Sequence, residues 1–144
     1  MLTSVAEGTA KDIDRAVAAA KKAFETSWGL NVPGARRGEL LNKLADLIEQ
    51  HSDELAALEA LNNGKTFNSA KGFDLDMSIG TIRYYAGWAD KIHGQVIETN
   101  EANLTYTRHE PIGVVGQIIP WNFPRMCNLR IHLSLRPLND TEQY

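Results

Sequence analysis

The stretch QIIPWNFP, Gln117 to Pro124, decides the fold. Its first three residues complete the mostly apolar run Val114 to Ile119. Such a run is typical of a strand buried on both faces, as in a parallel sheet. A parallel strand needs a crossover connection, usually a helix, before the next strand of its sheet. The prolines Pro120 and Pro124 bracket the loop that follows. The stretch therefore predicts an α/β fold with a strand that ends in a tight loop.

One polar side chain, Asn122, stands between Trp121 and Phe123 in this loop. Open α/β sheets bind their ligands at the carboxyl ends of strands. There the amide could donate a hydrogen bond to a developing oxyanion, a role worth roughly 3 kcal/mol of barrier. Loop asparagines very often bond the local backbone instead. From the residues alone, a turn-capping role for Asn122 is favoured, and the oxyanion donor is the alternative.

Helical periodicity marks four segments upstream of the stretch. A variant capping box of Thr9 and Asp12 opens the first, Ser52 caps the third, and the fourth is expected over Asp74 to Lys91. The expected buried positions are Ile13, Val17, Ala20, Phe24 and Trp28 in the first helix, Leu40, Leu41, Leu44, Leu47 and Ile48 in the second, Leu55, Leu58 and Leu61 in the third, and Met77, Ile82, Tyr84, Tyr85 and Trp88 in the fourth.

A change of period after His93 and Gly94 indicates a β-hairpin. Val96 to Thr99 and Leu104 to His109 alternate or carry β-branched and aromatic residues, and Asn100 to Asn103 is the expected turn.

Composition excludes several classes of protein. The chain has 144 residues, of which 43% are hydrophobic, enough for one ordinary globular domain. Its net charge of −3 argues against nucleic-acid and membrane-surface partners, both of which favour basic patches. The single cysteine, Cys127, excludes an internal disulfide framework and a multi-cysteine metal site. The four histidines lack the close pairing of a metal site, and Asp74 and Asp76 are expected to be solvated or capping carboxylates.

Several motifs occur together in one order along the chain. At EPIGVVGQIIPWNFP (Glu110 to Pro124) the sequence closely resembles the NAD(P)-dependent aldehyde dehydrogenase superfamily. The stretches AKKAFETSWG (Ala20 to Gly29), LEALNNGK (Leu58 to Lys65), RYYAGWADKIHG (Arg83 to Gly94) and YTRHEPIG (Tyr106 to Gly113) also look like its class 1 and class 2 members. The resemblance spans Ser4 to Pro124.

The resemblance implies a function for the loop. In the family, a cysteine thiolate attacks the aldehyde, hydride passes to the nicotinamide, and water activated by a glutamate hydrolyses the thioester. Asn122 matches the asparagine that helps to hold the oxyanion. The residues that match the border of the bound dinucleotide are Ile118, Ile119, Pro120 and Trp121. NAD is the expected cofactor, with NADP left open, and an aldehyde is the expected substrate.

The resemblance also implies a division into parts. Residues 1–94 match the helical part of the cofactor-binding domain, and residues 95–111 match strands of the oligomerisation domain. Residues 112–124 match the first Rossmann-type strand with its catalytic loop, and the rest of that sheet is expected to be missing. The parent family is homo-oligomeric, so Gln95 to Pro111 could also join full-length subunits.

Residues 125–144 depart from the family pattern, because Arg125, Asn128, Arg130 and Arg136 interrupt an otherwise apolar helix and Pro137 would break it. They are expected to be irregular or disordered, and Cys127 is not expected to be the family nucleophile. The 144 residues therefore look like an N-terminal fragment that is inactive alone. The alternatives are a non-catalytic oligomerisation or regulatory fragment and an unstable product of a faulty gene model. A cytoplasmic location is expected, with the mitochondrial matrix left open.

Overall fold

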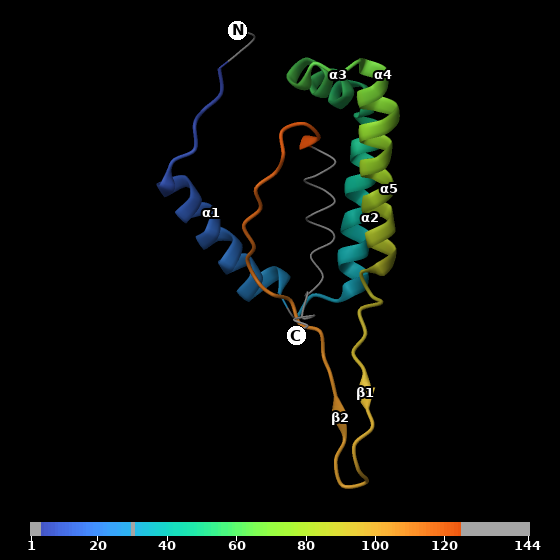
Figure 1. Ribbon diagram of the computed structural model, residues 1–144. Helices are drawn as coiled ribbons and strands as arrows, with labels where there is room; N and C mark the ends of the chain where they lie inside the picture. Colours follow the sequence, from blue (N-terminus) through green and yellow to red (C-terminus); the bar gives the residue numbers. More distant parts are fainter. Residues whose placement is uncertain (1–3, 30, 125–144) are drawn as a thin grey trace, which may run out of the picture.

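The computed structural model describes residues 4–29 and 31–124 (Figure 1). It is rich in helix and carries one small antiparallel sheet. The helices are α1 (Ala10–Ala23), α2 (Gly34–Gln50), α3 (Ser52–Asn63), α4 (Phe67–Ser69) and α5 (Asp76–Trp88), and the strands are β1 (Val96–Ile97) and β2 (Thr105–Tyr106). A π-helical turn, Phe24–Trp28, extends α1, and another, Ala70–Leu75, joins α4 to α5. The four predicted helical segments are confirmed, although the fourth α-helix begins at Asp76 rather than Asp74 and ends at Trp88 rather than Lys91. The predicted cap of the third helix is wrong, because Ser52 is its first residue and His51 is the N-cap.

The predicted capping box begins α1. The carboxylate of Asp12 accepts hydrogen bonds from the backbone N–H of Thr9 at 3.0 Å and from the Thr9 hydroxyl at 2.7 Å. These bonds hold the pKa of Asp12 below its usual value, with the backbone N–H as the larger cause. The helix that follows buries none of its residues.

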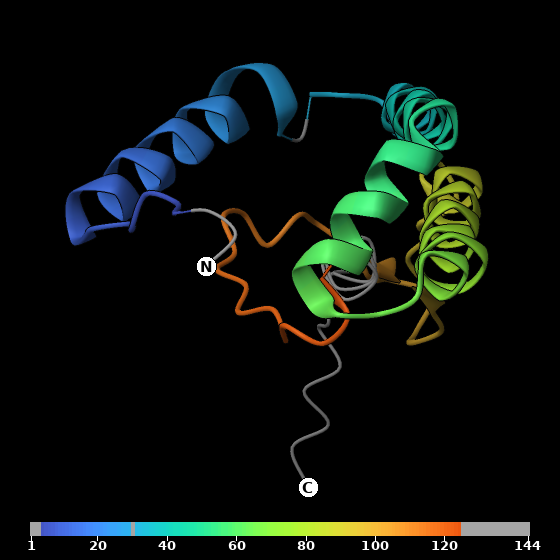
Figure 2. The same cartoon turned by 90° about the horizontal axis from the view of Figure 1, so that it is seen from above.

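The helices α2 and α5 lie side by side over most of their length, as Figure 2 shows when they are viewed end-on. Two glycines of α2 allow the close approach. A Cβ atom on Gly38 would lie 2.7 Å from the backbone oxygen of Ala86, and one on Gly34 would lie 2.3 Å from that of Ala89. No real Cβ contact is this short, so the first turns of α2 require glycine at both positions.

An arginine of α5 ties the two helices together on their solvent side. The guanidinium of Arg83 donates to Asp46 at 2.9 Å and to Glu49 at 2.7 Å, both on α2. These bonds, to Asp46 first and to Glu49 second, raise the pKa of Arg83 above its already high usual value.

The core of the described residues is built mainly from small side chains. Ala56, Ala70 and Leu75 form one buried cluster between α3 and the turn before α5, with Ile48 and Leu55 partly buried against it. Along α5 the buried positions are Ser78, Ile82 and Ala86.

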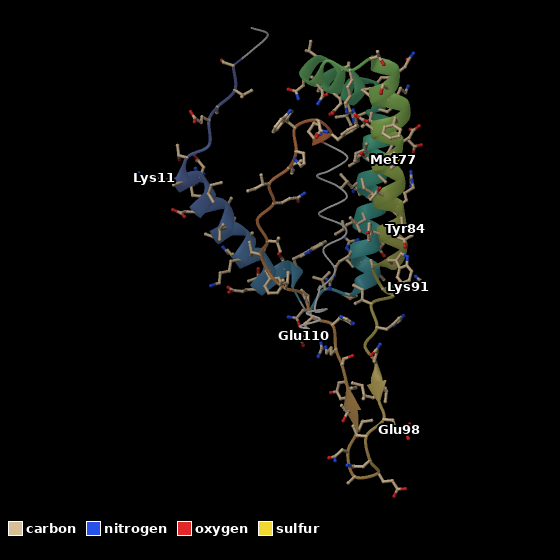
Figure 3. All side chains as sticks on the ribbon, viewed as in Figure 1. Lys11, Met77, Tyr84, Lys91, Glu98 and Glu110 are labelled. Atoms are coloured by element: carbon tan, nitrogen blue, oxygen red, sulfur yellow. The ribbon has the colours of Figure 1, made fainter. Side chains whose placement is uncertain are left out.

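Most of the predicted buried faces are wrong. Of the residues predicted to be buried on α5, only Ile82 is buried, and the exposed fractions of Met77, Tyr84 and Trp88 are 40%, 57% and 39%. These side chains lie along the outer part of the helix pair, where Figure 3 labels Met77 and Tyr84. The other predicted core residues that are exposed are Ile13, Val17, Ala20, Trp28, Leu44, Leu47, Leu58 and Leu61. On α2 and α5 the physical reason is that the two helices approach through their small residues, which turns the larger side chains outward. On α1 no residue is buried at all, so its apolar side chains remain exposed.

The predicted hairpin is confirmed with shorter strands. Val96 pairs with Tyr106 and Ile97 with Thr105, in antiparallel register. In the turn, the side-chain oxygen of Asn100 accepts bonds from the Ala102 backbone N–H at 3.0 Å and from the Asn103 amide at 2.9 Å. The hairpin projects beyond the end of the α2–α5 pair (Figure 1).

The predicted strand over Val114 to Ile119 is not formed in the described residues, and this prediction is wrong. Residues 107–120 run without regular structure back toward α3, shown in orange in Figure 1. A strand is defined by backbone bonds to a neighbour, and the one sheet in the described part of the chain consists of β1 and β2. Without a parallel neighbour the apolar run remains open, and Ile118 is 97% exposed.

No helix between residues 4 and 124, residue 30 aside, has the length and hydropathy that crossing a bilayer requires.

Candidate active site

The loop Trp121 to Pro124 returns to the end of α3, far away in the sequence. The side-chain amide of Asn63 donates to the backbone oxygen of Trp121 at 2.7 Å and to that of Asn122 at 3.2 Å. Asn63 is the last residue of α3, and Gly64 follows it with a φ of 77°, in the left-handed region that favours glycine. Because Gly64 turns the chain sharply, the end of α3 meets the loop.

A lysine next to this turn provides a second contact. The ammonium of Lys65 lies 3.7 Å from the centre of the Phe123 ring. The same ammonium pairs with the carboxylate of Asp74 at 2.5 Å. Lys65 thus bridges the loop and the π-helical turn before α5, and it contacts the residue next to Asn122.

The environment of Asp74 corrects a prediction. Its side chain is 1% exposed, so Asp74 is a buried partner of Lys65 rather than a solvated or capping carboxylate. Its carbonyl oxygen accepts a bond from the Ser78 hydroxyl at 2.6 Å, while its Oδ1 has no hydrogen-bond partner in the described part of the chain. A buried carboxylate is costly unless it is paired, which makes the contact with Lys65 essential to this arrangement.

The side-chain amide of Asn122 is open to solvent in the part of the chain that the structure describes. Within residues 4–29 and 31–124 its amide makes no hydrogen bond, and only its backbone oxygen has a partner, Asn63. The residue is exposed. Turn-capping, the role favoured by the residues alone, is therefore not what Asn122 does within the described residues.

The predicted cofactor border is in part open to solvent. Ile118 is 97% exposed and Trp121 is 87% exposed, whereas Ile119 is half-buried. Pro120 lies between them and is exposed. The structure brings Trp121 and Asn122 to the end of α3, but it brings Ile118 against no other part of the described chain.

Sequence reasoning missed the contribution of Asn63, Lys65 and Asp74. No local pattern reveals a contact between residues 58 positions apart, such as that of Asn63 with Trp121. The one signal that pointed to this turn was the stretch LEALNNGK among the motifs of the resemblance.

Two other kinds of site were considered in the sequence, a metal site and a cysteine nucleophile. Residues 4–29 and 31–124 contain no group of three or more histidine, cysteine or acidic side chains that could hold a metal ion. Cys127, with the predicted irregular segment 125–144, lies outside the described residues.

Comparisons with known proteins agree on one family. The model of the aldehyde dehydrogenase family matches residues 1–132, so the match continues past Pro124. The aldehyde dehydrogenase of Agaricus bisporus is 65% identical over 124 residues, and that of Emericella nidulans is 64% identical over 124. These alignments cover 86% of this chain and 25% and 24% of those proteins.

Solved structures of the same family resemble the fold. The aldehyde dehydrogenase of Bacillus cereus in complex with NAD+ has a TM-score of 0.79 and 53% identity, over 82% of this chain and 24% of that one. The aldehyde dehydrogenase KauB of Pseudomonas aeruginosa has a TM-score of 0.85 and 34% identity, over 89% of this chain and 26% of that one.

The described fold thus matches solved aldehyde dehydrogenase structures over part of their length. The chain belongs to the aldehyde dehydrogenase family. It spans about a quarter of the length of the curated relatives that it matches.

Proposed function

We propose that this chain supplies the oxyanion-binding loop for NAD(P)-dependent oxidation of an aldehyde to a carboxylic acid. The observation that carries the proposal is the exposed side-chain amide of Asn122, which has no hydrogen bond within the described residues and lies on a loop whose backbone is bonded by Asn63. An amide N–H held in place before the reaction stabilises negative charge as that charge develops on the aldehyde oxygen. The proposal draws further support from the family to which the chain belongs.

The described residues fit one border of a dinucleotide. Exposed Ile118 and Trp121 offer apolar surface that a bound nicotinamide could cover. The stretch GVVG, Gly113 to Gly116, does not have the glycine spacing of a phosphate-binding loop. We therefore expect NAD, or NADP, to bind the 144 residues weakly at most. The bound cofactor would accept the hydride, while Asn122 acts on the oxygen of the same substrate.

We infer further that the 144 residues alone do not oxidise aldehydes. An oxyanion donor stabilises a charge only after a nucleophile has attacked, and the resemblance does not match Cys127, the one cysteine of the sequence, to the family nucleophile. A steady-state assay of the purified chain with NAD and an aldehyde should give no NADH above a protein-free control. Aldehyde-dependent NADH formation by the purified chain would contradict this inference.

A hybrid enzyme tests the contribution of the loop. The 124 aligned residues of this chain replace the matching residues of the Agaricus bisporus relative, to which they are 65% identical. The hybrid should oxidise aldehydes with NAD, because the remainder of the relative would provide the nucleophile and the general base that the resemblance implies. A folded hybrid without activity would contradict the proposed function.

The hairpin favours a second function, association with other subunits. Val96, Leu104 and Tyr106 are 79%, 79% and 65% exposed, and the two strands form a sheet of their own in the described residues, so both edges can accept another strand. Strand addition across a subunit boundary would use these edges and cover the apolar side chains.

Co-expression of the tagged chain with an untagged full-length relative tests this association. The relative should be captured with the tagged chain, and Tyr106→Lys should weaken capture because it sets a charge on the apolar strand. Ala102→Lys adds the same charge at the turn, outside the strands, and should leave capture unchanged. Capture of no relative, or equal capture by both variants, would exclude the hairpin as the docking element.

A further inference from the structure

The last residue of α3, Asn63, and Lys65 just after it contact the loop on both sides of Asn122. The Asn63 amide bonds the backbone oxygens of Trp121 and Asn122, and its two N–H groups are enough for both bonds. Lys65 lies against the ring of Phe123, the next residue of the loop. The contacts reach the backbone before Asn122, its own backbone, and the side chain after it. They leave the Asn122 side chain itself without a hydrogen bond in the described part of the chain.

The capping of α3 does not explain the orientation of Asn63. The helix is already ended by Gly64, whose backbone N–H bonds the oxygen of Ala60 at 2.8 Å. The neighbouring Asn62 is exposed and its side chain makes no hydrogen bond within residues 4–29 and 31–124, so an asparagine side chain at this end needs no partner for the helix to stop. The Asn63 side chain is therefore available to the loop.

The buried carboxylate of Asp74 holds Lys65 in place. Lys65 is 17% exposed and Asp74 is 1% exposed, so their pair is shielded from water, and its attraction is stronger than that of a surface pair. A lysine held in this way loses little further freedom when it lies on the Phe123 ring. The ion pair thus ties Lys65 to the π-helical turn before α5, and the Phe123 ring of the loop packs against the Lys65 ammonium.

We propose that Asn63 and Lys65 are positioning residues, which set the direction of the Asn122 amide by holding the backbone of the loop on both sides of it. The proposal rests on the proposed function of Asn122 as oxyanion donor. Because the predicted strand before the loop is not formed in the described residues, these contacts, rather than a sheet, fix the loop here.

Heteronuclear NMR on the whole 144-residue chain, without ligand, tests the contacts first. A coupling across the hydrogen bond from the Asn63 side-chain nitrogen to the Trp121 carbonyl carbon should be present. The Lys65 protons next to the ammonium should show contacts to the Phe123 ring and a ring-current shift. The absence of both signals would overturn the proposal, whatever the enzyme does.

A matched pair of variants separates positioning from general stability. Asn63→Asp removes the donor without changing the size of the side chain, so the amide signals of Trp121, Asn122 and Phe123 should shift and their hydrogen exchange should rise about tenfold. Asn62→Asp introduces the same charge one residue earlier and should leave these signals unchanged. Equal effects of the two variants on the loop would overturn the proposal.

The contact between Lys65 and Phe123 is tested by one conservative and one disruptive variant. Lys65→Arg keeps a cation for both Asp74 and the ring, so the loop signals should stay close to those of the parent chain. Phe123→Leu keeps the ion pair but removes the ring, and should raise hydrogen exchange at Asn122 while the amide signals of α2 and α5 stay in place. Loop signals that do not respond to Phe123→Leu would count against the role of Lys65.

The hybrid enzyme separates failure of this proposal from failure of the proposed function. Asn63→Asp should lower kcat about ten- to a hundredfold with little change in KM, since misplacement of a catalytic group costs up to about a hundredfold. Asn62→Asp should leave both constants unchanged. If Asn122→Ala lowers kcat but Asn63→Asp does not, positioning is overturned and the function of Asn122 stands. If neither lowers kcat, the proposed function itself is wrong.

Discussion

The side-chain nitrogen of Asn63 lies 2.7 Å from the backbone oxygen of Trp121, although 58 positions separate the two residues in the chain. A second bond from the same amide reaches the backbone oxygen of Asn122 at 3.2 Å. The end of α3 therefore holds the loop in which Asn122 lies. Because the loop backbone is bonded to this distant helix end, a substitution at Asn63 should change the position of Asn122.

The ion pair between Lys65 and Asp74 should be sensitive to which partner is removed. Lys65→Met leaves the 1% exposed Asp74 carboxylate uncompensated and should lower the free energy of unfolding by about 3–5 kcal/mol. Asp74→Asn leaves a lysine that is 17% exposed and can turn toward water, so the loss should be smaller, about 1–3 kcal/mol. Urea unfolding followed by circular dichroism measures both.

A surface pair provides the control for this prediction. Lys71 and Asp53 are joined by the same bond length, 2.5 Å, but are 44% and 76% exposed. Lys71→Met should therefore cost at most about 1 kcal/mol. Equal losses for Lys65→Met and Lys71→Met would mean that burial does not strengthen the Lys65 pair.

The approach of α2 to α5 predicts opposite effects for two glycine substitutions. Gly38→Ala forces a Cβ atom to within 2.7 Å of the Ala86 backbone oxygen, and this strain of about 1–3 kcal/mol should exceed the gain in helix propensity, about 1 kcal/mol. Gly80→Ala meets no atom within 4 Å and should raise the free energy of unfolding by about 0.5–1 kcal/mol. Thermal unfolding of both variants measures the difference, and a stabilised Gly38→Ala chain would contradict the close approach.

Sequence patterns predicted the features that depend on hydrogen bonds between residues close together in the chain. The capping box at Thr9 and Asp12 and the turn at Asn100 to Asn103 each form within a few residues, and both are confirmed. The resemblance carried by the ordered motifs predicted the family, which the comparisons show.

Other features could not be predicted because they depend on distant partners. Both sides of α5 carry apolar residues, so periodicity could not decide that Ser78, Ile82 and Ala86 would be buried and Met77 and Tyr84 exposed. The choice follows from the small residues that α2 presents to α5. An apolar run such as Val114 to Ile119 becomes a strand only beside another strand, and the described residues give it none.

Acid should loosen the first turn of α1. The pKa of Asp12 is lowered in the folded chain, first by the bond from the Thr9 backbone N–H and then by the Thr9 hydroxyl. A lowered carboxyl pKa stabilises the fold above the ordinary value of 3.8, and this contribution is lost as the pH falls through the folded value, below 3.8. NMR signals of Thr9 and Ala10 followed during acid titration should show this loss.

Two asparagine variants check the assignment to Asp12. Asp12→Asn should remove the acid transition of the first turn. Asp14→Asn, at a carboxylate with no bonded partner in the described residues, should leave the transition in place. A transition that persists in Asp12→Asn would show that another group controls the turn.

The most direct test of the central claim is the kcat of the hybrid enzyme with Asn122→Ala. If the Asn122 amide donates to the developing oxyanion, kcat for aldehyde oxidation should fall about a hundred- to a thousandfold, as it does when one oxyanion-hole donor is removed from other enzymes. The helical content and the unfolding transition should stay those of the parent hybrid. A kcat within about twofold of the parent hybrid would contradict the claim that Asn122 is the oxyanion donor.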